Sequence, residues 1–226
     1  MAKIKSPTSP NFDERPEGTP IDMLVLHYTG MESAAAALER LCDPAAKVSA
    51  HYFIDEDGQV TALVDEGKRA WHAGVAFWRG EADVNGRSIG IELVNPGHEF
   101  GYRDFPGTQM AALEKLAAAI IERHPIPPRN VVGHADVAPA RKTDPGERFD
   151  WRRLAAEGIG LWPKLAAPVN ADAGRVRAML ARYGYDTADV AAAITAFQRH
   201  FRPARLDGVA DPETAGRLKA LLDLCR

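Results

Sequence analysis

Three side chains that suit metal-assisted hydrolysis lie within eleven positions of one another, at His134, Lys142 and Asp144. A neutral imidazole and a carboxylate are both ordinary Zn²⁺ ligands, and a catalytic zinc site has three protein ligands with an open fourth position. The lysine would add a cation beside an oxygen that becomes negative during hydrolysis. This cluster supplies only two ligands, so a metal hydrolase needs another histidine and a base from elsewhere in the chain.

His27 is the candidate for the missing ligand. It lies near the end of an apolar run at residues 21–28, which is typical of a buried strand, and a turn at Gly30 follows. Strand ends in α/β folds are where ligands and reactive groups gather. A lone histidine more often only packs or forms a hydrogen bond. Together with His134 and Asp144, however, it would leave Zn²⁺ one position for water.

Glu92 is the candidate for the base. It lies in an alternating run at residues 88–95, among side chains that should face a core. A carboxylate there is unexpected unless it is paired or functional, and a structural salt bridge is the alternative. As a general base, Glu92 would take a proton from the attacking water and pass it to the leaving amine. Burial would raise its pKa toward the working range.

Strand and helix patterns interleave over the first two thirds of the chain and must position these residues. The expected strands are residues 21–28, 51–55, 59–64, 88–95 and 130–132. The expected helices are residues 32–41 and 108–123, with Thr108 as the cap of the second. A hairpin turn is predicted at residues 56–58. This order predicts an α/β fold in which helices flank a mixed central sheet.

A change of composition around residues 162–168 divides the chain. Three helical segments follow, at residues 171–183, 187–201 and 211–224, and they can form a small domain. Asp211 and Pro212 have the types expected at the start of the last helix. The expected parts are an N-terminal extension (1–19), a catalytic domain (20–162), a linker (163–170) and a helical domain (171–226).

Composition and charge exclude several classes of partner. The net charge of −3 provides no basic surface for a nucleic acid. No apolar run approaches the roughly 18 residues that a membrane span requires. Residues 1–7 lack the apolar core of a secretory signal, and Cys42 and Cys225 are expected to be unpaired thiols. These features favour a cytoplasmic location, with the periplasm as the alternative if a leader peptide has been removed.

Several motifs in order resemble the type 2 N-acetylmuramoyl-L-alanine amidases, which are zinc enzymes that cut peptidoglycan. They are LHYTG at residues 26–30, SAHYFID at 49–55, RAWHAG at 69–74, SIGIE at 88–92, VGH at 132–134 and RKTDPG at 141–146. The resemblance covers roughly residues 20–160. It implies that His27, His134 and Asp144 hold Zn²⁺, that Glu92 is the acid/base, and that Lys142 stabilises the oxyanion.

Asp144 stands where some relatives have a cysteine, which places the resemblance closest to the bacterial branch that acts on 1,6-anhydromuropeptides. The implied reaction is hydrolysis of the amide between the lactyl group of N-acetylmuramic acid and L-alanine, in peptidoglycan recycling or turnover. Residues 196–201 and 206–214 resemble a peptidoglycan-binding module. Muropeptides or the intact sacculus are the expected partners. The alternatives are a non-enzymatic peptidoglycan-binding protein and a zinc deacetylase of another amide.

Five further residues are candidates for substrate contact because they lie in these motifs or in the loop before SIGIE. They are Tyr52, Trp71, His72, Asn85 and Arg87. An aromatic side chain at Trp71 could stack on a sugar or lactyl group, and the two loop residues before SIGIE could bind peptide groups. His51 is expected to form structural hydrogen bonds. His98, His124 and His200 have no clustered partners in the sequence and receive no role.

Overall fold

The computed structural model describes residues 8–163 and 167–225. Residues 1–7, 164–166 and 226 lie outside the described residues. They include the segment from which the absence of a secretory signal was predicted and part of the expected linker.

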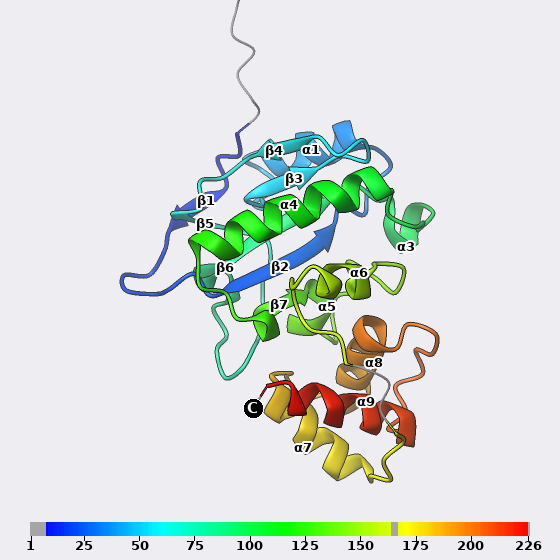
Figure 1. Ribbon diagram of the computed structural model, residues 1–226. Helices are drawn as coiled ribbons and strands as arrows, with labels where there is room; N and C mark the ends of the chain where they lie inside the picture. Colours follow the sequence, from blue (N-terminus) through cyan, green and yellow to red (C-terminus); the bar gives the residue numbers. More distant parts are fainter. Residues whose placement is uncertain (1–7, 164–166, 226) are drawn as a thin grey trace, which may run out of the picture.

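The centre is a five-stranded sheet with the order β4-β3-β6-β2-β7 (Figure 1). Its strands are β2 (Met23–Tyr28), β3 (Tyr52–Ile54), β4 (Val60–Ala62), β6 (Ser88–Leu93) and β7 (Val131–Gly133). β2 runs parallel to β6 and β7, whereas β3 and β4 form an antiparallel hairpin. The expected mixed sheet flanked by helices is confirmed.

One face of the sheet is covered by the long helix α4 (Gly107–Arg123), which crosses it in Figure 1. Leu26 of β2 and Ile91 of β6 point toward this helix and are fully buried with Leu113. Because side chains alternate along a strand, the intervening residues of β2 and β6 point to the opposite face. His27 and Glu92 are on that opposite face, which is partly covered by α1 (Ala34–Cys42).

The N-terminal extension contributes a strand, since β1 (Phe12–Glu14) pairs with β5 (Lys68–Ala70) in a separate two-stranded sheet. The start of α4 also differs from the prediction. Pro106 is the N-cap residue, and the hydroxyl group of Thr108 donates a hydrogen bond to the Glu56 carbonyl. The prediction of a threonine cap was therefore wrong, because this side chain fastens the β3–β4 hairpin instead.

Short helices and turns complete the part of the chain that precedes the three C-terminal helices. They are α2 (Val84–Arg87), α3 (Gly97–Phe100), η1 (Pro128–Asn130), α5 (His134–Val137) and α6 (Trp151–Ala156). No helix within the described ranges is long and apolar enough to cross a membrane. Cys42 and Cys225 are both free thiols, as expected.

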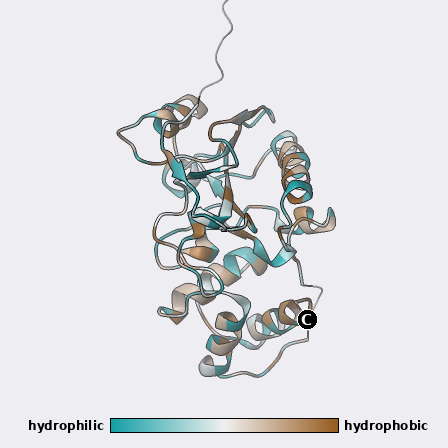
Figure 2. Cartoon of the chain, turned by 90° about the vertical axis from the view of Figure 1, so that its left-hand side faces the viewer, coloured by the Kyte–Doolittle hydropathy of each residue, from teal (hydrophilic) through white to brown (hydrophobic). Residues whose placement is uncertain are grey.

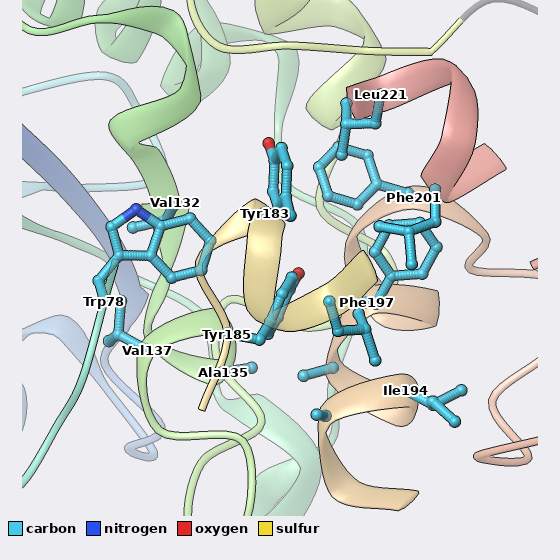
Figure 3. Packing of buried hydrophobic residues seen from close by; sticks show 14 of the residues in the cluster. Trp78, Val132, Ala135, Val137, Tyr183, Tyr185, Ile194, Phe197, Phe201 and Leu221 are labelled. Atoms are coloured by element: carbon cyan, nitrogen blue, oxygen red, sulfur yellow. The ribbon is translucent and has the colours of Figure 1, made fainter. Parts of the chain in front are cut away.

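The C-terminal helices are α7 (Ala173–Tyr183), α8 (Val190–Phe201) and α9 (Pro212–Asp223), and Asp211 caps α9 as predicted. These helices carry both hydrophilic and hydrophobic residues (Figure 2), and many of their apolar residues are buried. The buried residues of these helices form one cluster with residues of the preceding part of the chain, such as Trp78 and Val132. Figure 3 shows the rings of Tyr183 and Tyr185 beside Trp78. The two parts of the chain therefore share a hydrophobic core.

Candidate metal centre and active site

Three buried donor atoms meet at one point on the sheet face opposite α4. The Nδ1 atoms of His27 and His134 are 3.0 Å apart, and each lies 3.0 Å from Oδ2 of Asp144. Within the described residues, these side chains form a group able to hold a metal ion. Donors about 2.0–2.2 Å from a tetrahedral metal ion lie about 3.3 Å from one another, so this spacing fits such an ion.

The protein backbone brings the three donors together from distant segments. His27 lies near the carboxyl end of β2, and His134 opens α5 directly after the neighbouring strand β7. The Ala135 N–H donates a hydrogen bond of 2.9 Å to the Asp144 carbonyl, which draws the segment containing that aspartate alongside α5. Two neighbouring parallel strands and one loop therefore create the donor set.

The hydrogen bond made by Nε2 of His134 determines whether its Nδ1 atom carries a proton. Nε2 of His134 lies 3.0 Å from the Ala73 carbonyl oxygen, which can only accept, so Nε2 carries the proton. In a neutral imidazole, Nδ1 then presents a lone pair toward Asp144, whose carboxylate also only accepts. Two facing lone pairs repel unless a cation lies between them, so the donor chemistry fits a metal ion.

Electrostatics keep His27 and Asp144 in the forms that bind metals. Burial, together with the neighbouring His134, lowers the pKa of His27 to about 4, so the imidazole is neutral near pH 7. Burial alone would raise the pKa of Asp144, but the interactions with His134 and His27 hold it well below its usual value. A neutral imidazole and an ionised carboxylate are the ligating forms.

Glu92 lies beside this centre in an environment that suits a proton carrier. Its Oε2 atom is buried without a hydrogen-bond partner among the residues that the structure describes. Burial raises the pKa of Glu92 well above its ordinary value, the negative charge of Asp144 raises it further, and Lys142 opposes the shift. A carboxyl group whose pKa is raised toward neutrality can both accept and return a proton near pH 7.

A cavity of about 340 Å³ joins the centre to the surface. Glu92, Lys142 and the three donor residues line it, and so does Trp71. Lys142 acts on the pKa values of both Glu92 and His27, which places its charge close to the centre. The structure therefore brings together the five residues expected to carry the chemistry.

Two of the other candidates for substrate contact, Tyr52 and Arg87, lie away from the cavity. Tyr52 pairs in register with Ile91, on the α4 face of the sheet, and its hydroxyl group donates to Glu66. Arg87 forms a partly buried ion pair with Asp22. Neither Tyr52 nor Arg87 is among the residues lining the site cavity. One residue of register decides which face a strand side chain occupies, and the sequence motif alone did not reveal it for Tyr52.

His72 also lines the cavity, whereas Asn85 does not, and both are close to the centre. Nδ1 of His72 is 3.1 Å from Nε2 of His27, and its ring is largely buried. Oδ1 of Asn85 accepts hydrogen bonds from the backbone N–H groups of His72 and Ala73, at 3.2 and 2.8 Å. His51 is fully buried and bonds to the Gly90 N–H through Nδ1, which is the structural role expected for it.

A buried polar cluster next to the centre was not expected from the sequence. Asp136 accepts hydrogen bonds from Tyr185 at 2.5 Å and from the Gly133 N–H at 2.8 Å, and its Oδ2 is 2.7 Å from Nδ1 of His200. Tyr185 and His200 belong to the C-terminal region, whereas Asp136 lies one half-turn after the ligand His134. The only feature of the sequence that could have indicated this cluster was the position of Asp136 two residues after His134. The partners of Asp136 are too distant in the chain to be recognised from the sequence.

Comparison with known sequences identifies this arrangement. The sequence profile of the N-acetylmuramoyl-L-alanine amidases matches residues 17–147, and the profile of a peptidoglycan binding domain matches residues 170–218. The chain belongs to the N-acetylmuramoyl-L-alanine amidase family. Membership confirms the expected enzyme class, a hydrolase of the amidase type, and the expected C-terminal module.

Individual relatives of this amidase extend over nearly the whole chain. N-acetylmuramoyl-L-alanine amidase AmiD of Escherichia coli is 40% identical over 232 residues, which cover 90% of this chain and 83% of AmiD. The structure of AmiD in complex with anhydro-N-acetylmuramic acid-L-Ala-D-gamma-Glu-L-Lys superposes with a TM-score of 0.84 at 36% identity, covering 95% of this chain and 98% of AmiD.

A second amidase structure supports the same arrangement of both parts. AmpDh3 of Pseudomonas aeruginosa in complex with an anhydromuramic pentapeptide gives a TM-score of 0.76 at 34% identity, and the match covers 100% of this chain and 98% of AmpDh3. The 1,6-anhydro-N-acetylmuramyl-L-alanine amidase AmpD of Citrobacter freundii is 36% identical over 173 residues, covering 69% of this chain and 90% of AmpD.

Proposed function

We propose that this chain hydrolyses the amide bond between the lactyl group of N-acetylmuramic acid, in the 1,6-anhydro form, and the L-alanine of the stem peptide. The observation that carries the proposal is the convergence of His27, His134 and Asp144 beside Glu92, whose Oε2 atom is buried and whose pKa is raised. The substrates bound in the AmiD and AmpDh3 structures support the choice of anhydromuropeptides. Peptidoglycan recycling or turnover is the process in which this reaction would act.

Zn²⁺ is the proposed metal, held by His27, His134 and Asp144. Two imidazoles and one carboxylate form a common ligand set of catalytic zinc sites and leave a position open. When bound, the ion would lower the pKa of a water molecule and polarise the amide carbonyl. The neutral state of His27 and the ionised state of Asp144 are already favoured by their surroundings, so binding would release few protons.

Glu92 and Lys142 are the proposed catalytic residues. The Glu92 carboxylate takes one proton from the attacking water as the new C–O bond forms at the lactyl carbonyl. Lys142 stabilises the negative charge that develops on the carbonyl oxygen. Glu92 then delivers its proton to the alanine nitrogen as the C–N bond breaks. Its elevated pKa suits this second step, because a weakly basic carboxylate would hold the proton too loosely.

Substrate contact is proposed for cavity residues, among which Trp71 is the aromatic candidate for stacking on the sugar or lactyl group. Arg40 and Arg141 line the same cavity and offer positive charge to the carboxylates of a stem peptide. His72 and Asn85 contribute indirectly, because their polar atoms bond to His27 and to the backbone. Tyr52 and Arg87 have no part in this proposal, since both lie away from the cavity.

Mass spectrometry of the products tests the proposal. Purified anhydromuramyl tripeptide should split into anhydro-N-acetylmuramic acid and the free tripeptide, and a chelator should stop the reaction. Loss of acetate would instead indicate a deacetylase, and binding without any product would indicate a non-enzymatic peptidoglycan-binding protein. A parallel reaction with intact sacculi shows whether the C-terminal module extends the substrate range to the polymer. The cytoplasmic location stays a prediction, which fractionation of native cells can test.

A further inference from the structure

Behind the proposed metal ligands lies an ordered series of hydrogen bonds that leads from His27 to the backbone of α2. Nε2 of His27 is 3.1 Å from Nδ1 of His72, and Nε2 of His72 is 3.1 Å from Oγ of Ser88. Oγ of Ser88 is in turn 2.6 Å from the Val84 carbonyl oxygen. His27, His72 and Ser88 are all at most 8% exposed, so water does not compete for these bonds.

The direction of every proton in this series follows from its last member. The Val84 carbonyl can only accept, so the single hydroxyl proton of Ser88 is donated to it. Oγ of Ser88 must therefore accept from His72, which puts the His72 proton on Nε2. Nδ1 of a neutral His72 then carries a lone pair and accepts the Nε2 proton of His27. The Nδ1 lone pair of His27 is consequently left facing His134 and Asp144.

The tautomer of the second histidine ligand, His134, is fixed by Ala73, the residue that follows His72 in the chain. Nε2 of His134 donates to the Ala73 carbonyl, so its Nδ1 atom also presents a lone pair to the centre. Asn85 holds this loop in place by accepting from the backbone N–H groups of both His72 and Ala73. The side chain of His72 thus bonds to His27, and the carbonyl group of Ala73 bonds to His134.

The packing around His72 agrees with this role. A Cβ atom at Gly90 would lie 2.5 Å from Cγ of His72, so the glycine of the SIGIE motif provides the space for the imidazole. Ser88 and Gly90 are both in β6, which also carries Glu92. Alternate residues of one strand therefore support the ring behind His27 and supply the proposed base.

We infer that His72, Ser88 and Asn85 are positioning residues that hold both histidine ligands in the Nε2–H tautomer required for binding a metal through Nδ1. This inference rests on the proposed metal centre and reassigns two residues expected to contact substrate. Hydrogen bonds to the far nitrogen of a metal-bound histidine typically change metal affinity by about 10–100-fold. His72 and Ser88 should therefore control how tightly the zinc ion is held.

The experiment measures the release of Zn²⁺ from the zinc-loaded protein into excess chelator. His72→Leu removes both ring nitrogens, and Ser88→Ala removes the acceptor of the His72 proton. His72→Asn restores an acceptor oxygen near the position of Nδ1. Ser9→Ala is the matched control, because Ser9 is also buried and donates to a backbone carbonyl, that of Leu41. We expect His72→Leu to release zinc about 10–100-fold faster than wild type, and Ser9→Ala to match wild type. Ser88→Ala and His72→Asn should fall between these limits.

Imidazole nitrogen NMR of the metal-free protein provides a readout that a general loss of packing would not produce. Wild type should show both ligands as Nε2–H tautomers. In His72→Leu, His27 should become a mixture of tautomers while His134 keeps its own. Zinc release at the wild-type rate from His72→Leu, or a mixed His27 tautomer already in wild type, would overturn the inference. A wild-type protein that binds no zinc would contradict the proposed function, and the tautomers would still decide this inference.

Discussion

His27 and Glu92 are register partners on the neighbouring parallel strands β2 and β6. Paired residues on parallel strands point to the same face of a sheet, so the proposed ligand and the proposed base leave the sheet side by side. The opposite face of both strands packs against α4 through Leu26 and Ile91. The alternation that builds the core thus also directs the two reactive groups into one cavity.

Replacing Glu92 with Gln should separate catalysis from metal binding. The substitution keeps the shape of the side chain but removes its ability to carry the proton, and general acid–base catalysis contributes about 10²–10⁴-fold. We expect turnover to fall by about that factor while zinc content stays at the wild-type level. Elemental analysis and tripeptide release measure the two quantities. Near-normal cleavage by Glu92→Gln would show that another group is the base.

The same substitution should stabilise the fold at neutral pH. The pKa of Glu92 is raised in the folded state, so the stability that its protonated form contributes is complete below pH about 4.5 and declines as pH rises through the folded-state value. Glutamine has no such dependence. The advantage of Glu92→Gln in urea unfolding, measured with chelator present, should therefore grow from pH 5 to pH 8. An advantage that stays constant or shrinks over this range would contradict the raised pKa of Glu92.

Lys142→Met should lower kcat with little change in KM or zinc content. The cation is proposed to act on charge that develops only during the reaction, and loss of one such stabilising group costs about 10²–10³-fold. Lys115→Met is a suitable control, because Lys115 is an exposed residue of α4 on the other face of the sheet. Steady-state kinetics on the anhydromuramyl tripeptide distinguish the two variants. An increase in KM alone would indicate that Lys142 binds substrate and does not stabilise the oxyanion.

The C-terminal helices should unfold together with the catalytic domain. The shared hydrophobic cluster and the bonds of Asp136 to Tyr185 and His200 join the two parts. Tyr185→Phe leaves a buried carboxylate without one donor and should cost about 1–3 kcal/mol of stability. Tyr52→Phe is the control, since its hydroxyl group binds Glu66 at a more exposed position. Two separate calorimetric transitions, or equal losses in both variants, would contradict the coupling.

Much of the fold and the reactive centre was predictable because each rests on local patterns. A continuous apolar run identified β2, alternation identified β6, and helical patterns identified α4 and the three C-terminal helices. His27 and Glu92 were recognisable because polar groups in apolar strands are unusual. The ordered motifs around them indicated His134 and Asp144 as further metal ligands, and the structure brings both close to His27.

The remaining features depend on contacts that no local pattern contains. The register of β3 puts Tyr52 on the α4 face, and a shift of one residue would have reversed that outcome. His72 lies behind His27 because Gly90 on a distant strand leaves room for its ring. His200 meets Asp136 only after the C-terminal helices pack onto α5. Long-range packing decided all three positions.

Zinc titration of the metal-free protein tests the central claim most directly. After removal of metal by a chelator, Zn²⁺ is added back in steps while release of the tripeptide from anhydro-N-acetylmuramyl tripeptide is followed. The account predicts no cleavage at the start and a linear rise that levels off at one equivalent of zinc per chain, with Asp144→Ala inactive throughout. Full cleavage by the metal-free protein, or by Asp144→Ala, would contradict it.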